Sequence, residues 1–171
     1  TRPRSTIRCI LIYLSSRPMK SSRDYLRLGY HLIEACYLSF IYQKNRPDHI
    51  HTHFVTGATS IGMFLSELIS VPFSFTMHAS AIWIDPIALV TKLGRCKFCV
   101  SISDYNKNYV LQTYGEQWRP KFNIVHCGIR LPIERDENRS RKSKKEPISV
   151  LAVGQLMKRK GYHVLIEAAN I

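Results

Sequence analysis

The chain has 171 residues, of which 45% are hydrophobic and 22% charged. This composition supplies a packed core and excludes a disordered or low-complexity chain, while the length holds one ordinary domain but not a complete two-domain enzyme. The formal net charge of +13 favours a polyanionic neighbour, namely nucleic acid, an anionic membrane surface or a phosphorylated substrate.

The positive charge is concentrated near the N-terminus, where residues 1–47 carry nine basic and two acidic side chains. This segment also holds Tyr25, Tyr30, Tyr37 and Tyr42, so it either lies against anionic lipid or forms a solvated basic face. Its apolar runs are far shorter than the roughly 20 residues of a membrane-spanning helix, and no span is predicted. Five irregularly spaced cysteines predict reduced thiols in a cytosolic protein.

Predicted helices and strands alternate along the first three quarters of the chain. The apolar spacing predicts helices near residues 22–45, 58–69, 86–93 and 104–114, the last capped by Ser103, and strands over residues 49–52, 71–77, 98–102 and 122–126. Residues 7–14 fit either a strand or a buried helix. Such alternation predicts an α/β fold, with a parallel sheet covered by helices on both faces.

A second unit is predicted after a basic, nearly apolar-free stretch. We divide the chain into a partial first domain (residues 1–131), a basic linker (132–147) and the beginning of a second domain (148–171). Residues 148–153 read as a strand, residues 154–161 as a loop, and a helix begins at Tyr162. One strand and one partial helix cannot bury a core, so we expect the chain to end inside a domain.

Candidate ligand-binding residues follow the predicted strands. Ligands of open parallel sheets bind beyond the carboxyl ends of the strands, and the residues found there are His53, His78, Ser101 with Ser103, Gly128 and Gly154. The imidazole of His78 could donate a hydrogen bond to a sugar hydroxyl or act as an acid or base. Its nearest acidic neighbour in the sequence is Asp85.

Residues 154–161, Gly-Gln-Leu-Met-Lys-Arg-Lys-Gly, suggest a diphosphate site. A glycine after a strand allows close approach of the backbone, and the cations that follow can neutralise phosphate. The sequence has neither a P-loop nor a Gly-x-Gly-x-x-Gly fingerprint. A zinc site from Cys96, Cys99, His126 and Cys127 is disfavoured, because adjacent residues of one strand point to opposite faces.

Five segments together resemble glycosyltransferase family 4. They are residues 48–54, Asp-His-Ile-His-Thr-His-Phe; 72–79, Pro-Phe-Ser-Phe-Thr-Met-His-Ala; 101–106, Ser-Ile-Ser-Asp-Tyr-Asn; 124–129, Ile-Val-His-Cys-Gly-Ile; and 153–161, which opens Val-Gly-Gln-Leu and ends Lys-Gly. Their order and spacing are similar to those of the family from about residue 45 onward, with the closest likeness to bacterial exopolysaccharide or colanic acid transferases.

The resemblance implies a GT-B architecture of two Rossmann-like domains and retaining transfer of a sugar from a nucleotide-sugar donor to a glycan or lipid-linked acceptor. It implies no metal cofactor, a cytoplasmic location that is peripheral at the inner face of the plasma membrane, and no nucleic-acid partner. Under it, His78 contacts the donor sugar or assists catalysis, Lys160 and Arg159 with the Gly154 loop hold the donor diphosphate, and the remaining cleft residues are His51, His53, Ser103 and Gly128.

The sequence departs from the family pattern at Gln155, Ala81 and Arg130, where the family commonly has Arg, Asp and Asp. The family's first glycine-rich loop would precede Thr1 and its downstream donor motif would follow Ile171, so we expect a fragment that is inactive by itself. Two alternatives are a non-catalytic basic module that binds anionic lipid or nucleic acid, and a GT-B sugar-nucleotide epimerase.

Overall fold

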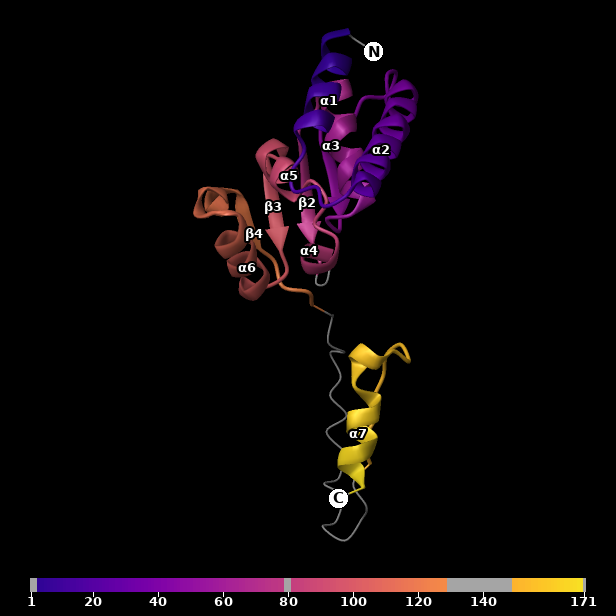
Figure 1. Ribbon diagram of the computed structural model, residues 1–171, viewed down its shortest axis with the longest axis vertical. Coiled ribbons are helices and arrows are strands. Elements are labelled where there is room, and N and C mark those ends of the chain that lie inside the picture. The colour runs from indigo at the N-terminus through magenta and orange to yellow at the C-terminus, as the bar shows by residue number, and fades with distance from the viewer. Residues whose placement is uncertain (1–2, 79–80, 129–148, 171) are drawn as a thin grey trace, which may run out of the picture. The chain divides into compact units, whose positions relative to one another are not determined.

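The first of two compact units, Thr1–Ile129, is built on a parallel sheet of four strands that lie side by side in chain order (Figure 1). The computed structural model describes residues 3–78, 81–128 and 149–170. The strands are β1 (Ile50–His53), β2 (Phe73–Met77), β3 (Phe98–Ser101) and β4 (Phe122–Ile124).

The helices of this unit connect the strands or precede them. They are α1 (Pro3–Ser15), α2 (Ser22–Ile41), α3 (Gly57–Ile69), α4 (Ala81–Ile84), α5 (Leu89–Arg95), α6 (Asp104–Tyr114) and the 3-10 helix η1 (Glu116–Lys121). Side-chain caps begin two of them: Ser21 accepts from the amide of Asp24, and Ser103 from that of Asn106. These hydroxyls satisfy N–H groups that have no partner within the helix.

The hydrophobic core lies between the sheet and α3. The strand side chains on this side include Phe73, Phe75 and Met77, all at most 1% exposed. Helix α3 packs closely on β1 at Gly62, where an added Cβ would lie 2.6 Å from Cγ2 of Thr52. Helices α1 and α2 cover the outer side of α3 (Figure 1). Since α3 is enclosed from both sides, most of its residues are buried.

The opposite face of the sheet carries a row of polar and aromatic side chains. The register pairs His51 with Ser74, His53 with Thr76, and Ser74 with Phe98, and side-by-side partners in parallel strands point to one face. His51 and His53 are exposed and Phe98 is half-buried. When parallel strands lie in sequential order, right-handed connections place all the connecting helices on one face of the sheet. In the described part of the chain, no helix therefore covers these histidines on the other face.

The predicted α/β class and parallel sheet are confirmed. The helix over residues 104–114 has the expected bounds and cap, and the open choice at residues 7–14 is resolved as a helix. Helix α2 ends at Ile41 instead of residue 45. The expected cover of helices on the second sheet face is not found among the described residues.

The second unit, Arg130–Ile171, contains the 3-10 helix η2 (Lys158–Lys160) and helix α7 (Tyr162–Ala169). The strand predicted over residues 148–153 is wrong for the described residues 149–153, which form none. Val150, Leu151 and Val153 are 71 to 88% exposed, because an isolated strand has no neighbour to pair its backbone groups. The predicted linker at residues 132–147 lies outside the described residues.

Candidate functional site

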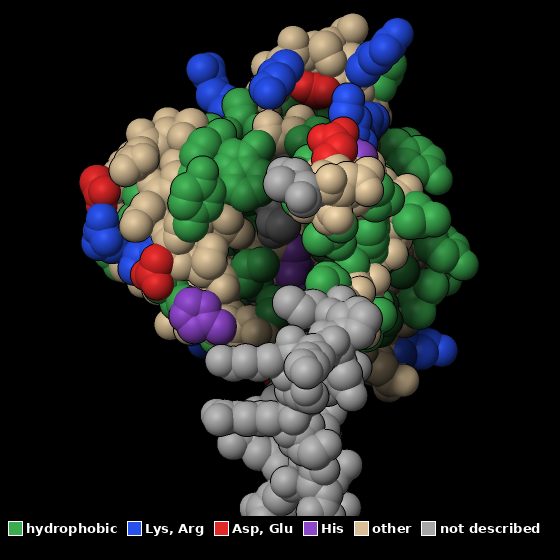
Figure 2. Space-filling model, turned by 90° about the horizontal axis from the view of Figure 1, so that it is seen from below, with side chains coloured by type: hydrophobic (Ala, Val, Ile, Leu, Met, Phe, Trp, Pro, Cys, Tyr) green, Lys and Arg blue, Asp and Glu red, His purple; other side chains and the backbone are tan. Residues whose placement is uncertain are grey.

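Two histidines meet at the carboxyl ends of β1 and β2. Nδ1 of His53 lies 3.1 Å from Nε2 of His78, and the two rings stack with their centroids 5.4 Å apart. One of these nitrogens must donate and the other accept, so the contact requires an unprotonated nitrogen. The strands point downward in Figure 1, so Figure 2 looks from below onto this end of the sheet, where histidine side chains are visible.

The residue after β1 adopts an unusual backbone conformation beside this pair. Phe54 has a φ of 68°, which is uncommon for a bulky residue and costs about 1–3 kcal/mol. Its amide donates to the carbonyl of Thr76, 2.9 Å away, and its ring lies 4.8 Å from that of His78. Such strained residues cluster at functional sites, because the surrounding structure must hold them in place.

His51 lies deeper along the same face and is held through both ring nitrogens. Its Nδ1 is 2.7 Å from Oγ of Ser74 and its Nε2 is 2.9 Å from Oγ1 of Thr76. Desolvation lowers the pKa of His51 below its ordinary value, and the neighbouring His53 and His49 lower it further. The neutral imidazole is therefore the favoured form.

The other predicted residues of this edge are placed around β3 and β4. Ser103 is half-buried, with its hydroxyl capping α6, and its carbonyl accepts a 2.7 Å hydrogen bond from Ser101. His126 Nδ1 lies 3.0 Å from the carbonyl of Ile102. Gly128 is exposed, and a Cβ added there would meet nothing within 4 Å. The hydroxyl of Ser103 is thus used to cap a helix, and the space around Gly128 is open.

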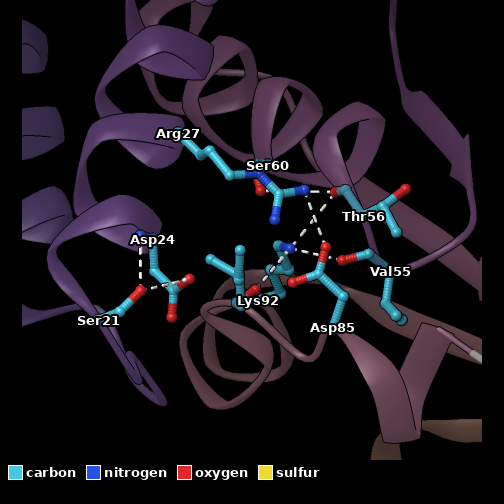
Figure 3. Close-up of polar contacts among 9 residues, drawn as sticks. Ser21, Asp24, Arg27, Val55, Thr56, Ser60, Asp85 and Lys92 are labelled. Atoms are coloured by element: carbon cyan, nitrogen blue, oxygen red, sulfur yellow. Dashed lines mark hydrogen bonds and ion pairs between the residues drawn. The ribbon is translucent and has the colours of Figure 1, made fainter.

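Asp85 is not the partner of His78, because its carboxylate forms an ion pair with Arg27 at 2.8 Å (Figure 3). Beside this pair lies Lys92, whose side chain is fully buried (Figure 3). Its Nζ donates to the carbonyls of Val55 and Ile87 at 2.6 and 2.7 Å, and to that of Thr56 at 3.4 Å. Lys92 therefore ties the segment that leaves β1 to the segment that enters α5.

Burial lowers the pKa of Lys92 from 10.5 to about 7, an effect that the charge of Asp85 partly opposes. Sequence reasoning missed this residue, because a lysine in a short helix is usually taken as solvent-exposed. The signal was its position on the apolar face of α5, with Leu89, Leu93 and Cys96 at steps of three and four residues. Among the described residues, Lys92 is the only charged side chain that is buried.

The cysteines are free thiols. Cys96 and Cys99 are both buried, and the thiol of Cys96 donates to the carbonyl of Leu93 at 3.4 Å. The neighbouring Cys96 thiol and burial raise the pKa of Cys99. Cys127 is exposed and His126 is engaged by the backbone. In the described ranges, no group of three or more histidine, cysteine or acidic side chains is placed to hold a metal ion.

The predicted diphosphate residues belong to the second unit. Arg159 and Lys160 lie in η2, and Gly161, with a φ of 72°, joins it to α7. A Cβ on Gly154 would lie 2.8 Å from the hydroxyl oxygen of Tyr162, so this glycine permits a close approach to the first residue of α7. Lys160, Arg159 and Gln155 are all exposed. Their role as a phosphate site stays a prediction.

The sequence matches no known protein-family model and no curated protein. Nor does any helix in the described part of the chain have the length and apolar character needed to cross a membrane.

Proposed function

We propose that this chain is part of a retaining glycosyltransferase of the GT-B type, similar to family 4. In this proposal the first unit is the acceptor-side Rossmann-like domain and the second is the beginning of the donor-binding domain. The observation that carries it is the contact between His53 and His78 at the carboxyl edge of a parallel sheet, beside the strained backbone of Phe54. Open α/β sheets bind ligands at this edge.

The histidine pair can orient a hydrogen bond toward a sugar. When Nδ1 of His53 donates to Nε2 of His78, the proton of His78 resides on Nδ1, which can then donate to a donor-sugar hydroxyl. His53 acts in this scheme as the positioning residue and His78 as the catalytic one. The exposed ring of Phe54 offers an apolar surface beside them, of the kind that sugar rings pack against.

The donor diphosphate is assigned to the second unit. Lys158, Arg159 and Lys160 follow one another and are separated from α7 by Gly161 alone. The N-terminus of α7 supplies backbone N–H groups suited to phosphate. These cations take the place of the arginine that family 4 commonly has at the position of Gln155. The acceptor is a glycan or a lipid-linked sugar, handled at the cytoplasmic face of the plasma membrane.

Donor hydrolysis by the full-length protein tests the proposal, with UDP-glucose and GDP-mannose as probes. Water replaces the nucleotide at the anomeric carbon, so the glycosidic carbon–oxygen bond to phosphate breaks and free nucleoside diphosphate is released. Replacing His78 with alanine should lower this rate about a hundredfold or more. His31→Ala is the control, because His31 lies on α2 and pairs with Glu34, outside the network of histidines on the sheet.

Lys160→Ala should instead weaken donor binding about tenfold, the size expected for a lost charge-assisted hydrogen bond. Calorimetric titration with UDP and GDP measures this effect without any turnover. If neither nucleotide binds the full-length protein, the donor assignment is wrong. If hydrolysis survives His78→Ala unchanged, His78 is not part of the mechanism.

A further inference from the structure

Helix α2 is apolar on two opposite sides. Its buried side, with Leu28 and Ala35, packs toward α3. The other side carries a stripe at alternating steps of four and three residues, each member 61 to 74% exposed: Leu26, Tyr30, Ile33, Tyr37 and Phe40. We call these five residues the α2 stripe. Soluble helices normally place polar residues on their outer side, so the stripe needs a partner.

The surroundings of the α2 stripe extend its apolar character. A groove of about 320 Å³ runs between α2 and α3, lined by Tyr30, Ile33, Tyr37, Leu38, Ile61 and Glu34. Helix α1, which packs beside α2, exposes Ile7, Leu11 and Leu14 by 57 to 64%. Figure 2 shows hydrophobic side chains gathered on the right-hand side, where α2 runs in Figure 1.

Charge is arranged around the stripe and not along it. Between residues 28 and 43, Glu34 is the only Asp, Glu, Lys or Arg. Its carboxylate pairs with His31 at 2.9 Å. Cations stand at both ends, with Arg23 before the stripe and Lys44 and Arg46 after it, whereas Arg27, in the first turn of the stripe, is paired with Asp85. An apolar centre with tyrosines and cationic ends matches a helix that lies in the interface of an anionic bilayer.

The same charges argue against a second copy of the chain as the partner. In an antiparallel pairing of two α2 stripes, Arg23 of one copy would face Lys44 and Arg46 of the other. In a parallel pairing each cation would face its own counterpart. Coiled-coil partners need opposite charges beside the apolar seam, and the acidic side chains of α2, Asp24 and Glu34, are already engaged within their own helix or cap.

We propose that the α2 stripe, with α1 beside it, docks the first unit onto an anionic lipid bilayer, α2 lying parallel to the membrane surface. The stripe from Leu26 to Phe40 is about 21 Å long at 1.5 Å per residue. A helix that lies in the interface buries its apolar face about 5–10 Å into the boundary between headgroups and acyl chains. This proposal does not depend on the proposed sugar transfer, since it concerns a separate surface and a different ligand.

Sedimentation with lipid vesicles tests it. The full chain should bind vesicles of equal parts phosphatidylglycerol and phosphatidylcholine, and bind pure phosphatidylcholine at least tenfold more weakly. Each cation lost from the rim, as in Arg23→Gln or Lys44→Gln, should weaken binding about fivefold at low salt. Binding of equal strength to both vesicle types would overturn the electrostatic part of the proposal.

A matched pair of double variants tests the surface itself. Ile33→Ser with Tyr37→Ser removes the centre of the stripe and should weaken vesicle binding at least tenfold. Ile84→Ser with Tyr105→Ser removes the same residue types at similar exposure, 75 and 71%, from α4 and α6, and should bind as the parent chain does. Far-UV circular dichroism checks that both variants are folded.

Sedimentation velocity without lipid tests the rival proposal that the partner of the α2 stripe is a second copy of the chain. If the parent chain forms a dimer that the stripe variant loses, and neither binds vesicles, then the partner is a second copy and the membrane proposal is wrong. Equal vesicle binding by the two double variants would also overturn it.

Discussion

Replacing Lys92 with methionine should change how the stability of the first unit depends on pH. The buried ammonium has a pKa of about 7 in the folded chain, against an ordinary value of 10.5. Between these values the unfolded chain binds a proton that the folded chain does not, so the free energy of unfolding rises with pH. With about 1.36 kcal/mol per pKa unit, the rise from pH 7 to pH 9 is about 2 kcal/mol.

The pH dependence is a sharper test than the stability at one pH. Methionine removes the desolvation cost of the charge, about 4 kcal/mol at pH 7 by the same relation. It also removes the two short hydrogen bonds to Val55 and Ile87, each worth about 1.5–3 kcal/mol. These opposing terms are similar in size and nearly cancel, whereas the proton linkage disappears completely in the variant.

Urea denaturation followed by far-UV circular dichroism at pH 7, 8 and 9 measures the effect. The stability difference between the parent chain and Lys92→Met should shift by about 2 kcal/mol toward the parent as the pH rises. All other titratable groups are common to both proteins, so their contributions cancel in this difference. Lys97→Met is the control, since Lys97 is exposed and its profile should parallel the parent. Parallel profiles for Lys92→Met would refute the depressed pKa.

Two further predictions concern α3 and the histidine face. Gly62→Ala should destabilise the first unit by about 1–3 kcal/mol in thermal denaturation, because its Cβ would lie 2.6 Å from Thr52. Gly29→Ala, also helical but at 3.5 Å from Tyr13, should be neutral or stabilising by up to about 1 kcal/mol; equal losses would contradict the close packing of α3. Because the pKa of His51 is lowered in the folded chain, the imidazole is protonated at a higher pH in the unfolded chain than in the folded one. As the pH falls below about 6.5, the unfolded chain therefore binds more protons and the free energy of unfolding decreases. His51→Gln should flatten this acid-side loss in pH-dependent urea melts; an unchanged slope would assign the loss to other groups.

The sequence predicted those features that are determined by residues close together in the chain. Ser103 identified the start of α6 because its side chain caps an amide three residues away. The placement of His53 and His78 on one edge followed from parallel strands, and the structure brings the two rings into contact; their catalytic roles stay predictions. In both cases the determining interactions are encoded by spacing along the chain.

Interactions between distant segments were harder to predict. The spacing of residues 7–14 fitted two structures, and the choice of helix depends on packing against α3, where the thiol of Cys9 contacts the carbonyl of Phe64. The strand predicted at residues 148–153 lacked a pairing partner, which no local pattern supplies. Lys92 was missed because its three carbonyl acceptors come from residues 55, 56 and 87, two of them far away in the sequence.

The hydrogen bonds of Ser74 couple two imidazoles. Its hydroxyl oxygen lies 2.7 Å from Nε2 of His49 and 2.7 Å from Nδ1 of His51. A hydroxyl has one proton, so when Ser74 donates to one ring it must accept from the other. A neutral imidazole carries a proton on only one of its two nitrogens. Nε2 of His51, which faces Thr76, is therefore protonated when Nδ1 is not, and unprotonated when Nδ1 carries the proton. The tautomers of His49 and His51 therefore switch together, and the direction of the hydroxyl of Thr76 switches with them.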